Sequence, residues 1–322
     1  MAIKRIVYKT HEEWLAGRGV IGASDIGTIV GVNPYEDPYE FWQRKKGLLP
    51  PKEETFAMKS GHYLEPAVAS FYHDASGRDI INNSASEFVV YNTDIPFIKV
   101  SPDRYFWREG KHSNDNKGIL ECKTTRMNID EEDLPKSWIC QLQLQLGICG
   151  MKFGSLAWYL NREDAFGYKD FNFVPDFYGW LIETASKFYT DYLIGDREPE
   201  PTSLKGLLLK YPKSTADKVL ALEDLFATEP EKAEKIALAC SEYKKVSDEM
   251  NEIKARKEAL EEQIKMCFDD SDAISYGGLT LATWKSAKDS EKLDAKALKA
   301  EHPDIAAQYT KLVPGSRRFL VK

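Results

Sequence analysis

The sequence predicts an α/β fold in which helices flank a mixed β-sheet, followed by a long C-terminal helix with a small α/β extension. Three observations predict it. Residues 79–123 contain short apolar runs separated by turn residues, the stretches 135–150 and 176–194 are amphipathic with the period of a helix, and residues 236–267 follow a heptad pattern. The first two observations predict the sheet and its helices, and the third predicts the long helix.

Length and composition limit the class of protein. A chain of 322 residues with 43% hydrophobic content can form one large or two smaller folded domains. No apolar run approaches the roughly 18 residues that a membrane span needs, and the N-terminus has no signal-peptide core. The five cysteines show no CxxC spacing, which argues against a zinc site and a disulfide framework. We therefore expect a cytoplasmic protein with no membrane partner.

The formal net charge is −7. This balance argues against a protein that coats itself with nucleic acid, because phosphate binding depends on clustered Lys and Arg. A local DNA site remains compatible with it, since positive charge can be confined to one cleft.

The N-terminal part begins with a strand candidate over residues 3–8 and a helix for which Thr10 is the predicted cap. Ser24 is then predicted as the N-cap of a short helix that ends at Gly31. Ser24 can be a cap and nothing more. Alternatively, the free backbone N–H groups at this helix start can hold a terminal phosphate of DNA together with Arg18.

Aromatic and basic residues alternate after Pro34. The run Pro38–Trp42 has helical spacing and is more typical of a core, although aromatic rings beside basic side chains can also stack on bases. Lys45 and Lys46 are candidate contacts to the DNA backbone. A further helix is predicted from Gly61 to about residue 75.

Residues 79–123 predict an antiparallel meander. Its strand candidates are Ile80–Ile81, Glu87–Tyr91, Phe97–Val100, Tyr105–Trp107 and Gly118–Lys123.

The strand Gly118–Lys123 carries the candidate chemistry. Side chains of a strand alternate between its faces, so Glu121 and Lys123 share one face. Asp103 follows the apolar run Phe97–Val100, and pairing of that run with the strand would bring Asp103 beside Glu121. Two such carboxylates suit Mg²⁺ or Mn²⁺, which prefer oxygen ligands. An ammonium at Lys123 could then hold and help to deprotonate a metal-bound water.

A helix is predicted over residues 135–150, and its Gln141 can reach this site as an amide donor to a phosphate or to the attacking water. Gln143 and Gln145 are interpreted as the polar face of the same amphipathic helix. Two further strands over residues 153–159 and 170–174 and a helix over residues 176–194 complete the α/β core.

The chain changes character at the Pro-rich, charged stretch 196–201. We predict a domain over residues 1–199, a linker with a short helix over 200–230, and a C-terminal region over 231–322. The heptad helix requires a partner helix, either residues 215–228 or another subunit.

The small C-terminal region is predicted as a strand over 279–285, a helix capped by Asp294 and a strand over 317–321. Arg317 and Arg318 are either DNA contacts or a solvated strand end.

Several separated motifs of this chain resemble, in order, those of the YqaJ-type viral recombinase family. This family is related to the lambda exonuclease within the PD-(D/E)xK nuclease superfamily, which has a restriction-endonuclease-like core. The resemblance covers roughly residues 12–199 and rests on the following residues: Gly22-Ala23-Ser24-Asp25, Gly31-Val32-Asn33-Pro34-Tyr35, Pro38-Tyr39-Glu40-Phe41-Trp42, Gly61-x-x-Leu64-Glu65-Pro66, Asp103, Glu121-Cys122-Lys123 and Gln141-Leu142-Gln143.

The resemblance implies a Mg²⁺-dependent exonuclease that degrades linear duplex DNA in the 5′-to-3′ direction, with Mn²⁺ as an alternative ion. Asp103, Glu121 and the backbone carbonyl of Cys122 would ligate two metals, and Glu65 would complete the coordination. Lys123 and Gln141 would act on the attacking water and the scissile phosphate.

The same resemblance implies 5′-phosphate recognition by Ser24 and Arg18, with Lys45 on the DNA backbone. It further implies a single-strand annealing protein as partner, a trimeric ring, and a phage or prophage origin in a bacterial cytosol. The alternative is a catalytically silent module that binds DNA and assembles through its C-terminal helix. Retention of Asp103, Glu121 and Lys123 together argues against this alternative.

Overall fold

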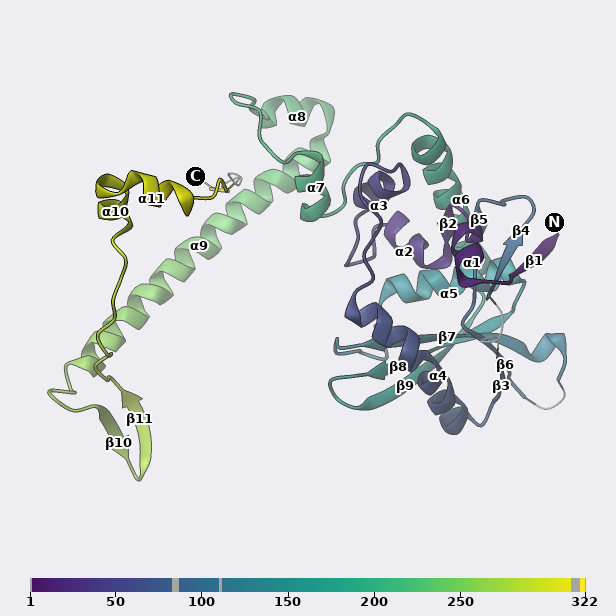
Figure 1. The fold of residues 1–322 in the computed structure, drawn as a ribbon, viewed down its shortest axis with the longest axis horizontal. Helices are drawn as coiled ribbons and strands as arrows, with labels where there is room; N and C mark the ends of the chain where they lie inside the picture. The colour runs from purple at the N-terminus through teal and green to yellow at the C-terminus, as the bar shows by residue number, and fades with distance from the viewer. Residues whose placement is uncertain (1, 83–86, 110–111, 314–318, 322) are drawn as a thin grey trace. The chain divides into compact units, whose positions relative to one another are not determined.

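The structure is a computed structural model that describes residues 2–82, 87–109, 112–313 and 319–321. The chain divides into two compact units, Met1–Pro212 and Lys213–Lys322, which are described separately below (Figure 1).

A five-stranded mixed sheet lies at the centre of the first unit. Its strands, in spatial order, are β3 (Asp79–Asn82), β6 (Arg104–Trp107), β7 (Lys117–Thr125), β8 (Phe153–Leu160) and β9 (Ala165–Asn172). The β7–β8 pair is parallel, and the other three neighbouring pairs are antiparallel. The predicted mixed sheet is therefore confirmed, with β7 as its middle strand.

The predicted five-strand meander is wrong. β4 (Glu87–Asn92) pairs with β1 (Ile3–Tyr8), and β5 (Ile98–Lys99) pairs with β2 (Ile21–Gly22). The run 97–100 thus does not pair with β7, and β6 takes that place. The apolar side chains of β4 and β5 instead pack in the core cluster that contains α5 (Lys136–Cys149).

Helices cover both faces of the sheet, as Figure 1 shows for α4 (Phe56–Ser76) and α5 on either side of β7 and β8. Successive residues of β7 divide between two buried clusters, because strand side chains alternate between faces. Ile119 packs with α5 and with α6 (Pro175–Phe188), whereas Leu120 packs with Val68 and Tyr72 of α4. The sheet therefore separates two cores.

Two predicted helix starts differ from the structure. α4 begins five residues before Gly61, because the side chain of Thr55 caps it by accepting the N–H of Met58. Glu65 consequently lies in the third turn of α4 and not near its positive end. The short helix η1 (Ala23–Asp25), continued by α2 (Ile26–Ile29), has Gly22 as its N-cap, so Ser24 lies inside the turn and does not cap it.

Other predicted ends are confirmed. Thr10 caps α1 (His11–Gly17) by accepting the N–H of Glu13 at 3.1 Å. Gly31 follows α2 with a φ of +75°, a left-handed conformation that favours glycine.

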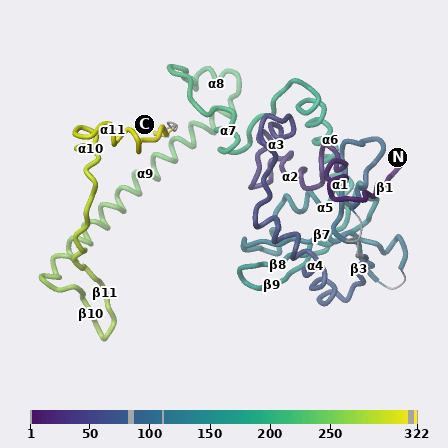
Figure 2. The backbone as a smooth tube through the Cα atoms, viewed as in Figure 1, coloured from purple at the N-terminus to yellow at the C-terminus, as the bar shows by residue number. Residues whose placement is uncertain are grey.

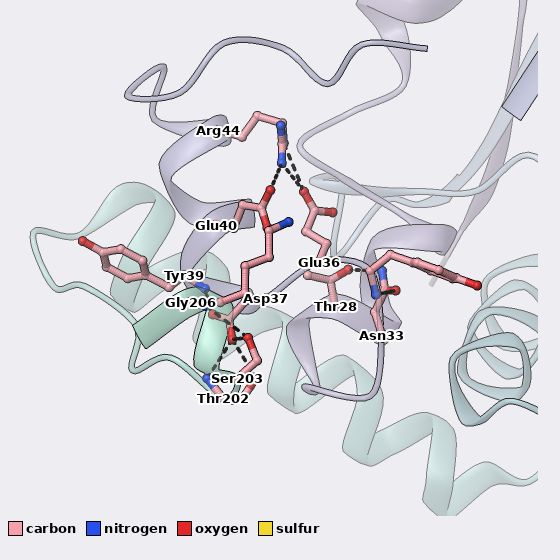
Figure 3. A network of polar contacts seen from close by, with 12 residues as sticks. Thr28, Asn33, Glu36, Asp37, Tyr39, Glu40, Arg44, Thr202, Ser203 and Gly206 are labelled. Carbon is pink, nitrogen blue, oxygen red and sulfur yellow. Dashed lines mark hydrogen bonds and ion pairs between the residues drawn. The ribbon is translucent and has the colours of Figure 1, made fainter. Parts of the chain in front are cut away.

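The aromatic run in α3 (Pro38–Lys45) belongs to the core, since Tyr39, Phe41 and Trp42 are all buried. Before it, Asp37 caps α3 by accepting the N–H of Tyr39, and its carboxylate accepts further hydrogen bonds from residues 202 and 203 (Figure 3). These bonds hold the start of α7 (Leu204–Lys210) against α3.

Only glycine fits where α7 meets this carboxylate. A Cβ on Gly206 would lie 2.3 Å from a carboxylate oxygen of Asp37. The segment after residue 199 is therefore part of the packing of the first unit.

The remaining elements of the first unit are η2 (Asn114–Asn116) and the π-helical turn η3 (Tyr189–Ile194), which continues α6. The second unit contains α8 (Leu222–Thr228), α9 (Pro230–Lys265), the hairpin β10 (Ala273–Tyr276) and β11 (Leu279–Thr283), α10 (Ala295–Glu301) and α11 (Pro303–Gln308). Figure 2 shows the extended stretch between β11 and α10.

The predicted long helix and the Asp294 cap are confirmed, because α9 has 36 residues and Asp294 accepts the N–H groups of Lys296 and Ala297. Arg317 and Arg318 lie outside the described residues. Residues 319–321 form no strand, so the predicted last strand is wrong for the part that the structure describes.

The heptad seam of α9 is largely exposed. α8 packs against α9, where Leu225 and Ala233 are buried. Farther along the helix, Met250, Ile253 and Leu260 are 66%, 69% and 50% exposed. Residues 215–228 thus cover the beginning of the seam and leave these positions open.

Among the described residues, no helix combines the length and the apolar character that crossing a membrane requires.

Candidate active site

The predicted catalytic residues surround the second half of β7. Leu120 and Cys122 face the α4 side of the sheet, where they pack in the smaller core cluster. Glu121 and Lys123 face the α5 side, and Glu121 is only 2% exposed. The alternation predicted from the sequence is therefore present in the structure.

Asp103 reaches the site from the residue before β6. Arg104 is the Cα partner of Leu120 across the β6–β7 ladder, which places Asp103 at the level of the next residues of β7. Its Oδ2 accepts the backbone N–H of Cys122 at 2.8 Å. The ladder that orients Asp103 is thus β6–β7, and not the one predicted with residues 97–100.

α5 supplies a third side chain. Lys123 Nζ lies 2.7 Å from Glu121 Oε1 and 2.8 Å from Gln141 Oε1, and Gln141 Nε2 donates to the same Glu121 oxygen at 2.5 Å. Gln141, Lys123 and Glu121 therefore form a closed triangle of charge-assisted hydrogen bonds. β7 and α5 are in contact, which holds the triangle together.

Glu65 is held near the site by a residue that the sequence analysis missed. Arg104 is 5% exposed, and its Nη1 lies 2.5 Å from Glu65 Oε1 and 2.6 Å from the backbone oxygen of Asp103. The signal in the sequence is an arginine directly after a candidate metal-ligating aspartate. Arg104 joins α4 to the start of β6.

The carboxylates influence one another. Burial raises the pKa of Asp103 well above its usual value, and the negative charges of Glu121 and Glu65 raise it further. Burial alone would lower the pKa of Lys123, but Glu121 and Asp103 outweigh burial and raise it. Lys123 is therefore a cation in this environment, whereas ionisation of Asp103 is disfavoured.

Within the described part of the chain, no group of three or more His, Cys, Asp or Glu side chains is arranged to hold a metal ion. Lys123 and Gln141 occupy one oxygen of Glu121, and Arg104 occupies one of Glu65. The donor chemistry nevertheless fits a hard divalent cation, because all three acids offer oxygen. Burial and the negative charges of Glu121 and Glu65 raise the pKa of Asp103, and a bound cation would offset that repulsion.

The three candidate phosphate ligands lie around η1. Lys45 Nζ is 3.5 Å from Asp25 Oδ2, and that carboxylate accepts the N–H of Gly22. A Cβ on Gly22 would lie 3.9 Å from a terminal nitrogen of Arg18. Ser24 is exposed on the same turn. The structure therefore brings two cations and one hydroxyl to a single short turn.

The interpretation of Gln143 and Gln145 as a polar helix face is wrong, because they are 2% and 0% exposed. Gln143 bonds to the backbone of Asn172 and Val174, at the end of β9 and before α6. Gln145 Nε2 donates to Glu121 Oε2 at 2.8 Å. Their alternation with Leu142, Leu144 and Leu146, which are all buried, marks a helix enclosed on several sides.

The comparisons with known proteins agree with the predicted resemblance. The family model of the YqaJ-like viral recombinase domain matches residues 13–152. The chain is similar to the uncharacterized protein YqaJ of Bacillus subtilis (strain 168), with 28% identity over 324 residues that cover 97% of this chain and 94% of the relative.

Two solved structures are similar to parts of the chain. An alkaline exonuclease from Laribacter hongkongensis is 19% identical, with a TM-score of 0.45, over 62% of this chain and 96% of its own. A phage related exonuclease from Haemophilus somnus 129PT is 11% identical, with a TM-score of 0.39, over 54% and 93%. The similarity to the YqaJ-like viral recombinase domain thus extends over residues 13–152, and the similarity to YqaJ of Bacillus subtilis extends over nearly the whole chain.

Proposed function

We propose that this chain is a Mg²⁺-dependent exonuclease that degrades one strand of linear duplex DNA from its 5′ end. The observation that carries the proposal is the meeting of Asp103, Glu121, Lys123 and Gln141 around the second half of β7. The match of residues 13–152 to the model of the YqaJ-like viral recombinase domain supports it. Mn²⁺ is the alternative ion, since it shares the preference of Mg²⁺ for oxygen donors.

The acidic residues would bind the cation. Asp103, Glu121 and the backbone carbonyl of Cys122 are the proposed ligands, and Glu65 completes the coordination from α4. When bound as a pair, the ions stabilise the negative charge that develops on the attacking and leaving oxygens of a phosphodiester. The Glu65–Arg104 pair keeps Glu65 directed toward this group.

Lys123 and Gln141 would act on the nucleophile. The Lys123 ammonium lies 2.7 Å from Glu121, so a water in this corner would contact a cation and an acceptor at once. Lys123 would hold the water and stabilise the hydroxide formed from it. The Gln141 amide would orient the water or the scissile phosphate.

The turn η1 would receive the 5′ end of the degraded strand. Arg18 and Lys45 supply the positive charge, and Ser24 supplies a hydroxyl donor. Direction follows from this assignment, because an enzyme that holds a 5′-phosphate near its catalytic groups removes nucleotides from that end.

The first experiment incubates linear duplex DNA with Mg²⁺ and compares the parent with Lys123→Ala and Asp103→Asn. We expect each change to lower the rate about a hundredfold or more, because it removes a water-positioning group or a ligand. DNA binding should persist in both variants. Lys152→Ala is the matched control, since Lys152 pairs on the surface with Asp115 and is distant in sequence from these groups.

An absence of turnover by the parent on every DNA end would contradict the proposal. It would favour instead a nuclease-fold module that binds DNA without cutting it and assembles through its C-terminal helix.

A second experiment tests direction and the phosphate pocket. Duplexes labelled at the 5′ or 3′ end should show early loss of the 5′ label. Ser24→Ala should slow the digestion of 5′-phosphorylated ends more than that of 5′-hydroxyl ends. Equal slowing of the two substrates would remove this role from Ser24.

A single-strand annealing partner, a trimeric ring and the cytosol of a bacterial host remain part of the proposal through the family resemblance alone. The division into a nuclease domain over residues 1–199, a linker over 200–230 and a C-terminal region is likewise proposed. Light scattering of the purified chain would test the trimer, and limited proteolysis would test the linker.

A further inference from the structure

Gln145 contacts the proposed catalytic carboxylate from a position inside the protein. Its side chain has no exposed surface, and its Nε2 donates to Glu121 Oε2 at 2.8 Å. The other oxygen of this carboxylate, Oε1, accepts from Lys123 and Gln141. Glu121 is thus held at both oxygens. Among the described residues, Gln145 is the side chain that donates to Oε2.

Both oxygens need a donor if the carboxylate is to have one orientation. The terminal torsion of a glutamate side chain joins sp³ and sp² carbons, so its rotational preference is broad. Lys123 and Gln141 fix the position of Oε1 only. The bond from Gln145 to Oε2 then determines the plane in which the carboxylate lies.

A role in stability alone does not account for Gln145. Its Oε1 is buried and has no hydrogen-bond partner among the described residues. Burying an unpaired carbonyl costs free energy, and an apolar side chain of similar size would avoid that cost. The feature that the amide adds is its contact with Glu121.

Gln143 provides the contrast, on the same helix and nearly as buried. Its Nε2 donates to the backbone oxygen of Asn172 at 2.8 Å, and its Oε1 accepts the N–H of Val174 at 3.0 Å. Both ends of this amide therefore bond to backbone at the β9–α6 connection. Gln143 joins elements of the fold, whereas Gln145 joins the fold to Glu121.

We propose that Gln145 is a positioning residue that sets the orientation of the Glu121 carboxylate for cation binding. The inference rests on the proposed function, because it assumes that Glu121 is a ligand. Residues that hold metal ligands in this way typically change metal affinity or activity about 10- to 100-fold when they are removed. The same range is expected here.

The test compares Gln145→Met with Gln143→Met in the full chain, since methionine keeps the length of the side chain and removes the amide. Titration with MnCl₂, followed by water-proton relaxation, measures cation affinity without turnover. We expect Gln145→Met to weaken Mn²⁺ binding about 10- to 100-fold and to raise the Mg²⁺ concentration for half-maximal cleavage by a similar factor. DNA affinity should not change.

The control should behave in the opposite way. Gln143→Met should lower the thermal midpoint and leave Mn²⁺ affinity within about twofold of the parent, because its bonds lie in the β9–α6 connection. Equal Mn²⁺ affinity in the parent and in Gln145→Met would overturn the proposal.

A measurement on the parent itself does not depend on the folding of a variant. In protein labelled with ¹⁵N at glutamine, addition of MgCl₂ should shift the side-chain amide signals of Gln145 and leave those of Gln143 in place. Unchanged Gln145 signals, in a protein that binds Mn²⁺ and cuts DNA, would contradict the positioning role alone. A parent that neither binds Mn²⁺ nor cuts DNA would overturn the proposed function and this inference together.

Discussion

The two units of the chain bury their apolar residues very differently. In Met1–Pro212, two clusters on opposite faces of the sheet contain side chains such as Leu120 and Leu181 with no exposed surface. In Lys213–Lys322, Met250, Ile253 and Leu260 of α9 are at least half exposed. The fold of the first unit is thus specified by long-range packing.

The helix of the second unit depends mainly on local interactions. α9 is rich in Ala, Glu and Lys, which favour helix without any tertiary contact. Pairs one turn apart, such as Glu261 with Lys265 at 2.7 Å, add to this. The same substitution should therefore lower the free energy of unfolding much more in the first unit than on α9. The candidate active site lies in the first unit, where packing can fix the positions of its side chains.

The largest expected effect comes from Leu181→Ala in α6. Leu181 is fully buried, so the change removes apolar contacts and leaves a cavity in the larger cluster. We expect a loss of about 2–5 kcal/mol in the free energy of unfolding, measured by urea denaturation. A loss below about 0.5 kcal/mol would mean that the core of the first unit is as loosely packed as α9.

Asp170→Asn tests a polar contact of the same unit. Arg78 donates to both oxygens of Asp170, at 2.8 and 2.6 Å. Although burial alone would raise the pKa of Asp170, the hydrogen bonds from Arg78 and Ser155 lower it overall. Because Asp170 is one-third exposed, we expect a loss of about 2–3 kcal/mol at pH 7, less than for a fully buried pair.

The pH dependence of this pair has a definite sign. A carboxyl group with a lowered pKa stabilises the fold above its ordinary pKa of 3.8, and this stabilisation disappears as the pH falls through the lowered value. The parent and Asp170→Asn should therefore differ most near neutrality and converge in acid. A difference that persists unchanged at low pH would exclude the ion pair as its cause.

Asp103→Asn should have a smaller effect of the opposite sign. The raised pKa of Asp103 means that its ionisation, at pH values above 3.8, destabilises the metal-free fold. Asparagine removes the charge and keeps an oxygen for the N–H of Cys122. In the presence of a chelator at pH 7, we expect the free energy of unfolding to rise on the order of 1 kcal/mol. With Mg²⁺, the same variant should lose cleavage. A destabilised variant would show that the carboxylate is needed for folding.

The smallest effect is expected for Leu260→Ala, the counterpart of Leu181→Ala. Leu260 is half exposed on α9, and alanine is the best helix former. The free energy of unfolding should change by less than about 0.5 kcal/mol. A loss that approaches that of Leu181→Ala, or that depends on protein concentration, would show that another surface covers this seam in solution.

Several features of this chain could be predicted from the sequence because they depend on neighbouring residues. The face shared by Glu121 and Lys123 follows from the two-residue period of a strand. The caps at Thr10 and Asp294 follow from side chains that reach their own helix starts. The heptad spacing likewise indicated the position of α9, since its period lies within one helix.

Tertiary structure decided the remainder, because those contacts join residues that are far apart in the chain. β6 pairs with β7, whereas β5, within residues 97–100, pairs with β2. Packing between distant parts of the chain decides between these pairings, and no local period contains that information. The burial of Gln145 likewise depends on the strand that lies opposite α5. Sequence thus determined which groups the site can use, and packing decided which side chains hold them.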